Sequence, residues 1–220
     1  MQSSAATSVP AAGTPATRML LTFGVIGAPL FVIVSLLQAF TREGFDPTRH
    51  PISMLSLGEL GWIQVANFVL SGLLIFACAV GLRRVLHPGR AGTWGPLLIA
   101  VFGLSLIGGG VFLADPGLGF PPGAPEGPPP SVSTEGIVHG IAFGFGMLSL
   151  ITSFFVFARR FAAAGERGWA RYSIVSGVLF LVMIVAGMAT QDFRILTAAT
   201  VVGWGWVAAA VAHIRSWVSA

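Results

Sequence analysis

The sequence predicts an all-α membrane protein built as a bundle of six transmembrane helices. Three observations predict this fold class. Of the 220 residues, 55% are hydrophobic and 9% are charged, whereas soluble globular domains carry roughly 25% charged residues. The mean hydropathy of the chain is +0.85. Six apolar stretches recur along it, and each has about the 20 residues that a helix needs to cross a bilayer.

The first predicted element is a polar tail over residues 1–18, which has no charge before Arg18. It lacks the basic start and the apolar core of a signal peptide, so we expect a disordered cytoplasmic tail. The membrane domain then covers residues 19–215. Its predicted spans are residues 19–40, 62–82, 94–114, 136–158, 172–190 and 195–213.

Residues inside the first three spans and the fifth span support these assignments. Pro29 in the first span is tolerated because neighbouring helices can satisfy the freed backbone groups. Trp62, Trp94 and Tyr172 begin the second, third and fifth spans, and aromatic rings favour the level of the lipid headgroups. We therefore expect each of these spans to start at a membrane surface.

The fourth span has glycine at every fourth position, at Gly136, Gly140 and Gly144. This spacing predicts a ridge that lets another helix pack closely. The fifth and sixth spans are separated only by residues 191–194, so we expect a tight hairpin between them.

The arginines are distributed unevenly between the two sides of the predicted bundle. Nine lie on the side of the termini, namely Arg18, Arg83, Arg84, Arg90, Arg159, Arg160, Arg167, Arg171 and Arg215. Three lie on the other side, namely Arg42, Arg49 and Arg194. Because cytoplasmic loops are enriched in basic residues, we predict that both termini are cytoplasmic and that the protein resides in a bacterial cytoplasmic membrane.

The same charge distribution accounts for the sequence pI of about 11.0. The basic residues mark topology, so nucleic acid binding is not implied. On the cytoplasmic side we expect the arginines to contact anionic lipids, at about 1 kcal/mol per residue near the surface.

Two absences exclude large classes of chemistry. The chain contains no lysine, which excludes a retinal or pyridoxal Schiff base and a phosphate-binding P-loop lysine. Its one cysteine, Cys78, excludes an intrachain disulfide, a cysteine zinc site and an iron–sulfur cluster.

Candidate functional residues concentrate on the outer side, in the loops over residues 41–61 and 115–135. The second loop contains seven of the fourteen prolines, so it can fold back as a lid with a small loss of entropy. Residues 52–60 in the first loop could form a short interfacial helix after Pro51. In the second span, Gln64 and Asn67 share a helix face, where they form either interhelical hydrogen bonds or the polar wall of an outward-open cavity.

Asp115 and His139 flank the second outer loop. A carboxylate at the C-terminal end of the third span is unfavourable, so we expect an arginine or a cation opposite Asp115. We predict that His50, Asp115 and His139 point into one outer cavity. The candidate ligand-binding residues are Arg49, His50, Ser53, Gln64, Asn67, Asp115, His139 and Asp192.

His50, Asp115 and His139 are also a chemically adequate set for a zinc-like ion. The spacing does not demand a metal, because no pair of histidines has the i, i+4 pattern of a metal-binding helix. Asp192 is equally well placed to cap the last span. No other cofactor is expected.

The stretch from Asp46 to Trp62, DPTRHPISMLSLGELGW, resembles a bacterial membrane family catalogued as domain-of-unknown-function family 998. The stretches Gly110–Pro116, Gly119–Gly123 and Gly165–Trp169, with His139 and Gly140, are similar to the same family. The resemblance covers nearly the whole chain after residue 18. It implies six helices and no particular reaction, and it places emphasis on Arg49, His50, Ser53, Asp115 and His139.

These observations favour a binding protein over an enzyme. The favoured hypothesis is an outward-facing polar pocket for a small ligand or a lipid headgroup. One alternative is a metal-dependent membrane hydrolase that uses Asp115, His50 and His139, with Ser53 nearby. Another is a structural subunit that pairs with another membrane protein through the glycine ridge of the fourth span.

Overall fold

The computed structural model describes residues 13–218, which form six long helices and one short 3₁₀ helix. The elements are α1 (Pro15–Thr41), η1 (Ile52–Ser56), α2 (Gly61–Leu86), α3 (Arg90–Val111), α4 (Thr134–Ala163), α5 (Arg167–Thr190) and α6 (Phe193–Ser216). All six long helices are long and apolar enough to cross a membrane. The predicted fold class, a multi-pass helical membrane protein, is therefore confirmed.

The helix ends differ from the predicted spans by a few residues. Helix α1 begins at Pro15 because the Thr14 hydroxyl accepts a hydrogen bond from the Thr17 backbone N–H and proline is favourable in the first turn. Pro15–Arg18 are thus helical and do not belong to a tail. Residues 1–12 of the predicted tail lie outside the described residues.

Helix α3 ends at Val111, three residues before the predicted end of the third span. The run Gly108–Gly110 lowers helix propensity there, and Phe112 is extended. The sequence analysis placed Asp115 at the end of the third span. In the structure it lies beyond α3, in the segment that leads to α4.

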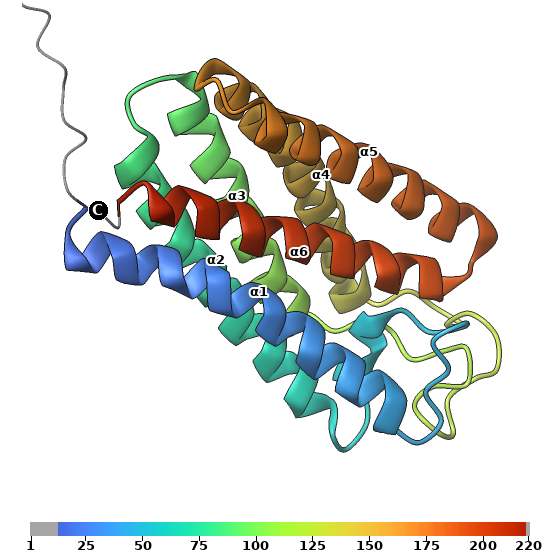
Figure 1. Cartoon of the computed structure of the whole chain (residues 1–220). Coiled ribbons are helices and arrows are strands. Elements are labelled where there is room, and N and C mark those ends of the chain that lie inside the picture. Colours follow the sequence, from blue (N-terminus) through green and yellow to red (C-terminus); the bar gives the residue numbers. More distant parts are fainter. Residues whose placement is uncertain (1–12, 219–220) are drawn as a thin grey trace, which may run out of the picture.

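The six long helices form a closed ring (Figure 1). Each contacts the next along the chain, and α6 returns to contact α1. Both described termini lie at one end of the bundle, which we call the terminal end. The loops over residues 42–60 and 112–133 lie together at the other end, which we call the loop end.

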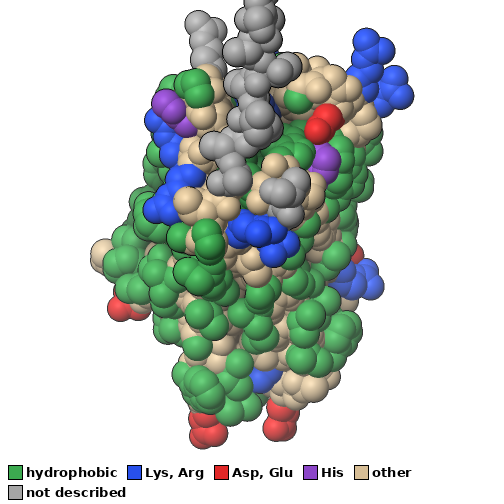
Figure 2. Space-filling view, turned by 60° about the vertical axis from the view of Figure 1, so that its left-hand side comes forward, with side chains coloured by type: hydrophobic (Ala, Val, Ile, Leu, Met, Phe, Trp, Pro, Cys, Tyr) green, Lys and Arg blue, Asp and Glu red, His purple; other side chains and the backbone are tan. Residues whose placement is uncertain are grey.

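Aromatic side chains fill the middle of the ring. Phe31 of α1 stacks on Trp204 of α6 with ring centroids 4.5 Å apart, and Phe102 of α3 lies 5.2 Å from the same indole. Many leucines, valines and isoleucines are instead exposed on the outer surface, as expected of helices that contact lipid. In Figure 2 the arginines gather toward the terminal end, at the top of the view, and most visible acidic side chains lie toward the other end.

Glycines let α2 and α3 approach closely. A Cβ on Gly72 would lie 2.7 Å from the Gly103 carbonyl oxygen, and a Cβ on Gly103 would lie 2.8 Å from the Gly72 carbonyl oxygen. The predicted ridge on α4 behaves differently. A Cβ on Gly140 or Gly144 would meet nothing within 4 Å, so this ridge packs against no helix of the described chain.

We predict that Gly103→Ala destabilises the protein by about 1–3 kcal/mol, because the added methyl group overlaps backbone atoms that cannot move aside. Gly144→Ala should be neutral or slightly stabilising, since it has space and alanine favours the helix. Thermal unfolding followed by circular dichroism in detergent measures both. Equal midpoints for the two variants would contradict the close approach of α2 and α3.

The orientation of the bundle stays a prediction that labelling tests. Cys78 is fully buried, so the native thiol gives little background. Ser131→Cys at the loop end should react with an impermeant maleimide added to intact cells, and Ala163→Cys at the terminal end should react only after the membrane is opened. The reverse pattern would place both termini outside.

Candidate functional site

The two long loops pack against each other into a cover, the loop-end lid (residues 42–60 and 112–133). Phe45 of the first loop and Phe120 of the second belong to one buried cluster, with ring centroids 5.4 Å apart. Arg42 donates hydrogen bonds to the carbonyls of Leu55 (3.1 Å) and Leu57 (2.6 Å) and lies 5.6 Å over the Phe120 ring. Partial burial lowers the pKa of Arg42. The lid is therefore a packed structure with its own small core.

His50 lies inside this lid and is only 2% exposed. Its Nδ1 accepts a hydrogen bond from the Asp46 backbone N–H at 2.9 Å, so the ring proton sits on Nε2, which donates to the Leu118 carbonyl at 2.8 Å. Phe45 and Phe120 pack on the imidazole. Both nitrogens are occupied, so His50 joins the two loops and leaves no atom for a ligand.

Asp115 interacts with the beginning of α4. Its Oδ2 accepts a hydrogen bond from the Ser133 backbone N–H at 3.0 Å, and a Cβ on Gly136 would overlap the carboxylate. The positive end of the α4 dipole is thus one favourable partner of the Asp115 carboxylate. Among residues 13–218 no arginine forms an ion pair with Asp115, because α3 ends early and brings Asp115 to the next helix, while a cation there stays a prediction.

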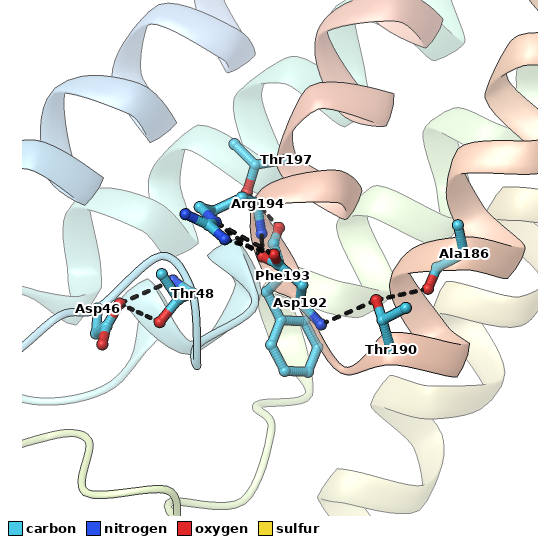
Figure 3. A network of polar contacts seen from close by, with 8 residues as sticks. All are labelled: Asp46, Thr48, Ala186, Thr190, Asp192, Phe193, Arg194 and Thr197. Carbon is cyan, nitrogen blue, oxygen red and sulfur yellow. Dashed lines mark hydrogen bonds and ion pairs between the residues drawn. The ribbon is translucent and has the colours of Figure 1, made fainter.

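The outer arginines have other partners. Arg49 pairs with Glu126 at 3.4 Å, where both side chains are exposed and the ion pair adds little stability. Arg194 pairs with Asp192 at 2.7 Å, which lowers the pKa of Asp192. Asp192 also accepts from the Arg194 backbone N–H and caps α6, as the sequence predicts (Figure 3).

The hairpin between α5 and α6 is linked to the loop-end lid. The Phe193 backbone N–H donates to the Thr48 carbonyl at 3.3 Å. Asp46 in turn accepts from the Thr48 N–H at 2.8 Å and from its hydroxyl at 2.7 Å, which lowers the pKa of Asp46 (Figure 3). The candidate residue Asp192 thus precedes the residue that contacts the lid and itself pairs with Arg194.

Gln64 and Asn67 form a buried network between α2 and α1. Gln64 accepts from Gln38 at 2.7 Å and donates to Ser35 at 3.0 Å. Asn67 donates to the Phe31 carbonyl at 3.1 Å. Of the two interpretations that the sequence allows, the structure shows interhelical hydrogen bonding and not the wall of an outward-open cavity.

A central cavity of about 100 Å³ lies under the lid, between α3 and α4 on one side and α6 on the other. Two of the predicted residues, Ser53 and His139, line it. The Nδ1 of His139 donates to the Phe112 carbonyl at 2.9 Å, so in the neutral ring Nε2 is an acceptor. No described residue forms a hydrogen bond with this Nε2 or with the Ser53 hydroxyl.

The predicted set of His50, Asp115 and His139 is therefore not assembled into one cavity. His50 is enclosed in the lid, Asp115 caps α4, and only His139 lines the central cavity. Among residues 13–218, no group of three histidine, cysteine, aspartate or glutamate side chains is placed to hold a metal ion. The three predicted metal ligands thus act separately in the described structure.

Sequence reasoning missed most of the cavity wall. It includes five aromatic rings, namely Phe31, Phe68, Phe102, Phe143 and Trp204. Ser105 of α3 also lines the cavity. Its hydroxyl, like that of Ser53 and the Nε2 of His139, has no hydrogen-bond partner in the described part of the chain. Aromatic residues occur in every predicted span, so no pattern in the sequence separates these five from those that face lipid.

We predict that Asn67→Ala destabilises the protein by about 1–2 kcal/mol, because interhelical hydrogen bonds in membranes contribute about 0.6 and at most 1.7 kcal/mol each and the variant also leaves Gln64 and Ser35 short of partners. Ser53→Ala, which breaks no hydrogen bond among the described residues, should change stability by less than about 0.5 kcal/mol. Unfolding by denaturing detergent measures both. A neutral Asn67→Ala variant would remove the structural role of the network.

The comparisons with known proteins agree with this architecture. A family model described as "Protein of unknown function (DUF998)" matches residues 25–213. No curated protein and no solved structure matches the chain. The match spans all but the first part of α1 and the last residues of α6. The chain therefore belongs to the DUF998 family of proteins of unknown function.

Proposed function

We propose that this protein binds the apolar part of an amphipathic membrane molecule in the central cavity. The observation that carries the proposal is the composition of the cavity wall, which has five aromatic side chains and a few polar groups without partners. Ligand pockets in proteins are typically lined in this way, with many apolar contacts and a small number of groups that fix orientation.

The size of the cavity limits what can enter. Its volume of about 100 Å³ is somewhat below the roughly 150 Å³ of an apolar cavity that binds benzene. A lipid headgroup with its hydration shell is too large for this volume. We therefore propose an apolar ligand in place of the headgroup that the sequence analysis considered. The end of one acyl or isoprenoid chain matches both the volume and the wall.

An access path from the membrane is supported by the packing of α4 and α5. A Cβ on Gly177 of α5 would lie 2.7 Å from Phe154 of α4, so the two helices touch there. Closer to the loop end, Gly187 of α5 approaches Leu196 of α6, while Gly140 and Gly144 on the same side of α4 meet nothing. We propose that a chain enters from the lipid between α4 and α5 at this level.

Polar side chains line the part of the cavity nearest the loop end, where we expect the polar head of such a molecule to lie. Ser53 belongs to η1 at the loop end, and His139 lies in the second turn of α4. Together with Ser105 they offer two hydroxyls and an imidazole nitrogen. These neutral groups suit a hydroxyl, a carbonyl or an ester, and we expect them to orient the ligand.

The arginine distribution supports the finer localisation. With nine arginines on the side of the termini, we propose that the loop end faces outward from a bacterial cytoplasmic membrane. The cavity would then receive its ligand from the outer leaflet.

The open face of α4 supports one second candidate function. Because Gly140 and Gly144 have free space beside them, a helix of another membrane protein could pack there. In that case Gly144→Leu would block the partner helix and lower the mass of the complex purified in detergent. Gly109→Leu, which lies inside the cavity, would leave this mass unchanged.

Gly109 offers a direct test of ligand binding. A Cβ at this position would lie 3.8 Å from both His139 and Phe68, so alanine fits and leucine projects into the cavity. We predict that lipid with brominated acyl chains quenches the fluorescence of Trp204 in the wild type and in Gly109→Ala, and that Gly109→Leu abolishes this quenching. A Trp204→Phe variant identifies the Trp204 signal by difference.

The control for folding is the helix content and the thermal midpoint of each variant. Leucine fills space that is empty, so we expect Gly109→Leu to stay within about 1–2 kcal/mol of the wild type. Undiminished quenching of Trp204 in a folded Gly109→Leu protein would show that no chain enters the cavity, and the proposed function would fail.

A further inference from the structure

A second and larger cavity lies at the terminal end, far from the central cavity. Its volume is about 780 Å³. Its wall combines the start of α1, the ends of α2, α4 and α6 and the turn between α4 and α5. Five separate segments of the chain therefore converge on one space.

Three of the side chains that line this wall are arginine or histidine. Arg84 and His87 come from the end of α2, and Arg160 comes from the end of α4. The Nε of Arg160 is buried and has no hydrogen-bond partner in the described structure. Among residues 13–218, no acidic side chain forms an ion pair with Arg84 or Arg160. A buried donor of a charged group left without a partner is costly.

The remaining groups of the wall do not neutralise these arginines. Glu166 is the one acidic residue among the described residues that line the cavity. Its carboxylate is bound to His213 at 2.6 Å, and the imidazole stacks on Trp169 with ring centroids 4.2 Å apart. The first turn of α1, with Thr14 and Thr17, also lies at the cavity and adds the positive end of its dipole.

We infer that this cavity is a binding site for a phosphate group, carried by a membrane lipid or by a soluble compound. A guanidinium presents parallel N–H donors that match phosphate oxygens, and a helix N-terminus favours the same anion. A phosphate in this cavity would accept hydrogen bonds from the guanidinium groups of Arg84 and Arg160, which line it. This site is distinct from the central cavity and does not depend on the function proposed for it.

Topology alone does not explain the arrangement. Arg159 and Arg160 are neighbours on α4 and serve the positive-inside pattern equally, but Arg159 is exposed and does not line the cavity. Arg83 donates to the Gly92 carbonyl and to Thr93, both at 2.9 Å, whereas Arg84 lines the cavity without such a partner. In each arginine pair one member is thus directed to the cavity.

The test is calorimetric titration of the purified full-length protein in a nonionic detergent at constant ionic strength. One arm uses inorganic phosphate, and the second uses dihexanoyl phosphatidylglycerol, with dihexanoylglycerol as the control that lacks the phosphate. The variants are Arg160→Gln and Arg84→Gln, and the matched control is Arg159→Gln. All three substitutions remove one positive charge at the same end of the bundle.

We expect saturable binding of at least one phosphate-bearing probe and no binding of dihexanoylglycerol. Arg160→Gln and Arg84→Gln should each weaken binding about tenfold or more, while Arg159→Gln should change it less than twofold. Tighter binding of the phosphatidylglycerol than of free phosphate would assign the site to a lipid headgroup. Equal binding of both would assign it to the phosphate group itself.

Two results would overturn the inference. One is the absence of saturable binding of either probe by the wild type. The other is an equal loss in Arg159→Gln and in the two cavity variants, which would show a general effect of charge. Should Arg160→Gln lose its helix content, the exposed Arg84 still decides the outcome, because its replacement removes no described hydrogen bond.

Discussion

The close approach of α2 and α3 at Gly72 and Gly103 determines where the rest of the bundle can be placed. Apolar side chains gain little by leaving lipid for a protein interior, so helices in a membrane depend on tight packing and hydrogen bonds. The missing side chains bring the two backbones together. Phe102 precedes one of these glycines and Phe68 lies one turn before the other, so the same contact directs both rings into the central cavity.

Most buried polar side chains have a partner, although Gln38 Oε1 and Ser56 Oγ have none among the described residues. Those between α1 and α2, such as Gln64 and Asn67, have partners on the neighbouring helix, and His50 has partners in both loops of the lid. His139 and Arg160 each keep a nitrogen that no described residue satisfies, and both border a cavity. A ligand in either cavity could therefore add hydrogen bonds to a side chain that lines it, His139 in one and Arg160 in the other.

The spans could be predicted because hydropathy and length act on each segment separately. The arrangement of the site residues could not be predicted, because it depends on how the two outer loops fold against each other and against the helix ends. The roles of His50 and Asp115 follow from the Leu118 carbonyl and from the end of α3 at Val111, and neither has a sequence signal strong enough to place it. The aromatic wall was missed for a different reason. Helices that are apolar all round have no periodic face that separates the interior from lipid, so Trp204 looks like any other membrane tryptophan.

The two cavities lie toward opposite ends of the bundle. Trp204 lies 11 residues after Phe193, the first residue of α6, so the central cavity reaches about 17 Å from the loop end at 1.5 Å per residue. That is close to half of the roughly 30 Å hydrocarbon core. Arg84 lies near the C-terminal end of α2, at the terminal end of the bundle. The 26 residues of α2 extend about 39 Å. One lipid occupies one leaflet, so no single molecule can place its chain beside Trp204 and its phosphate beside Arg84. The chain proposed for the central cavity and the phosphate proposed for the terminal end would therefore belong to separate molecules.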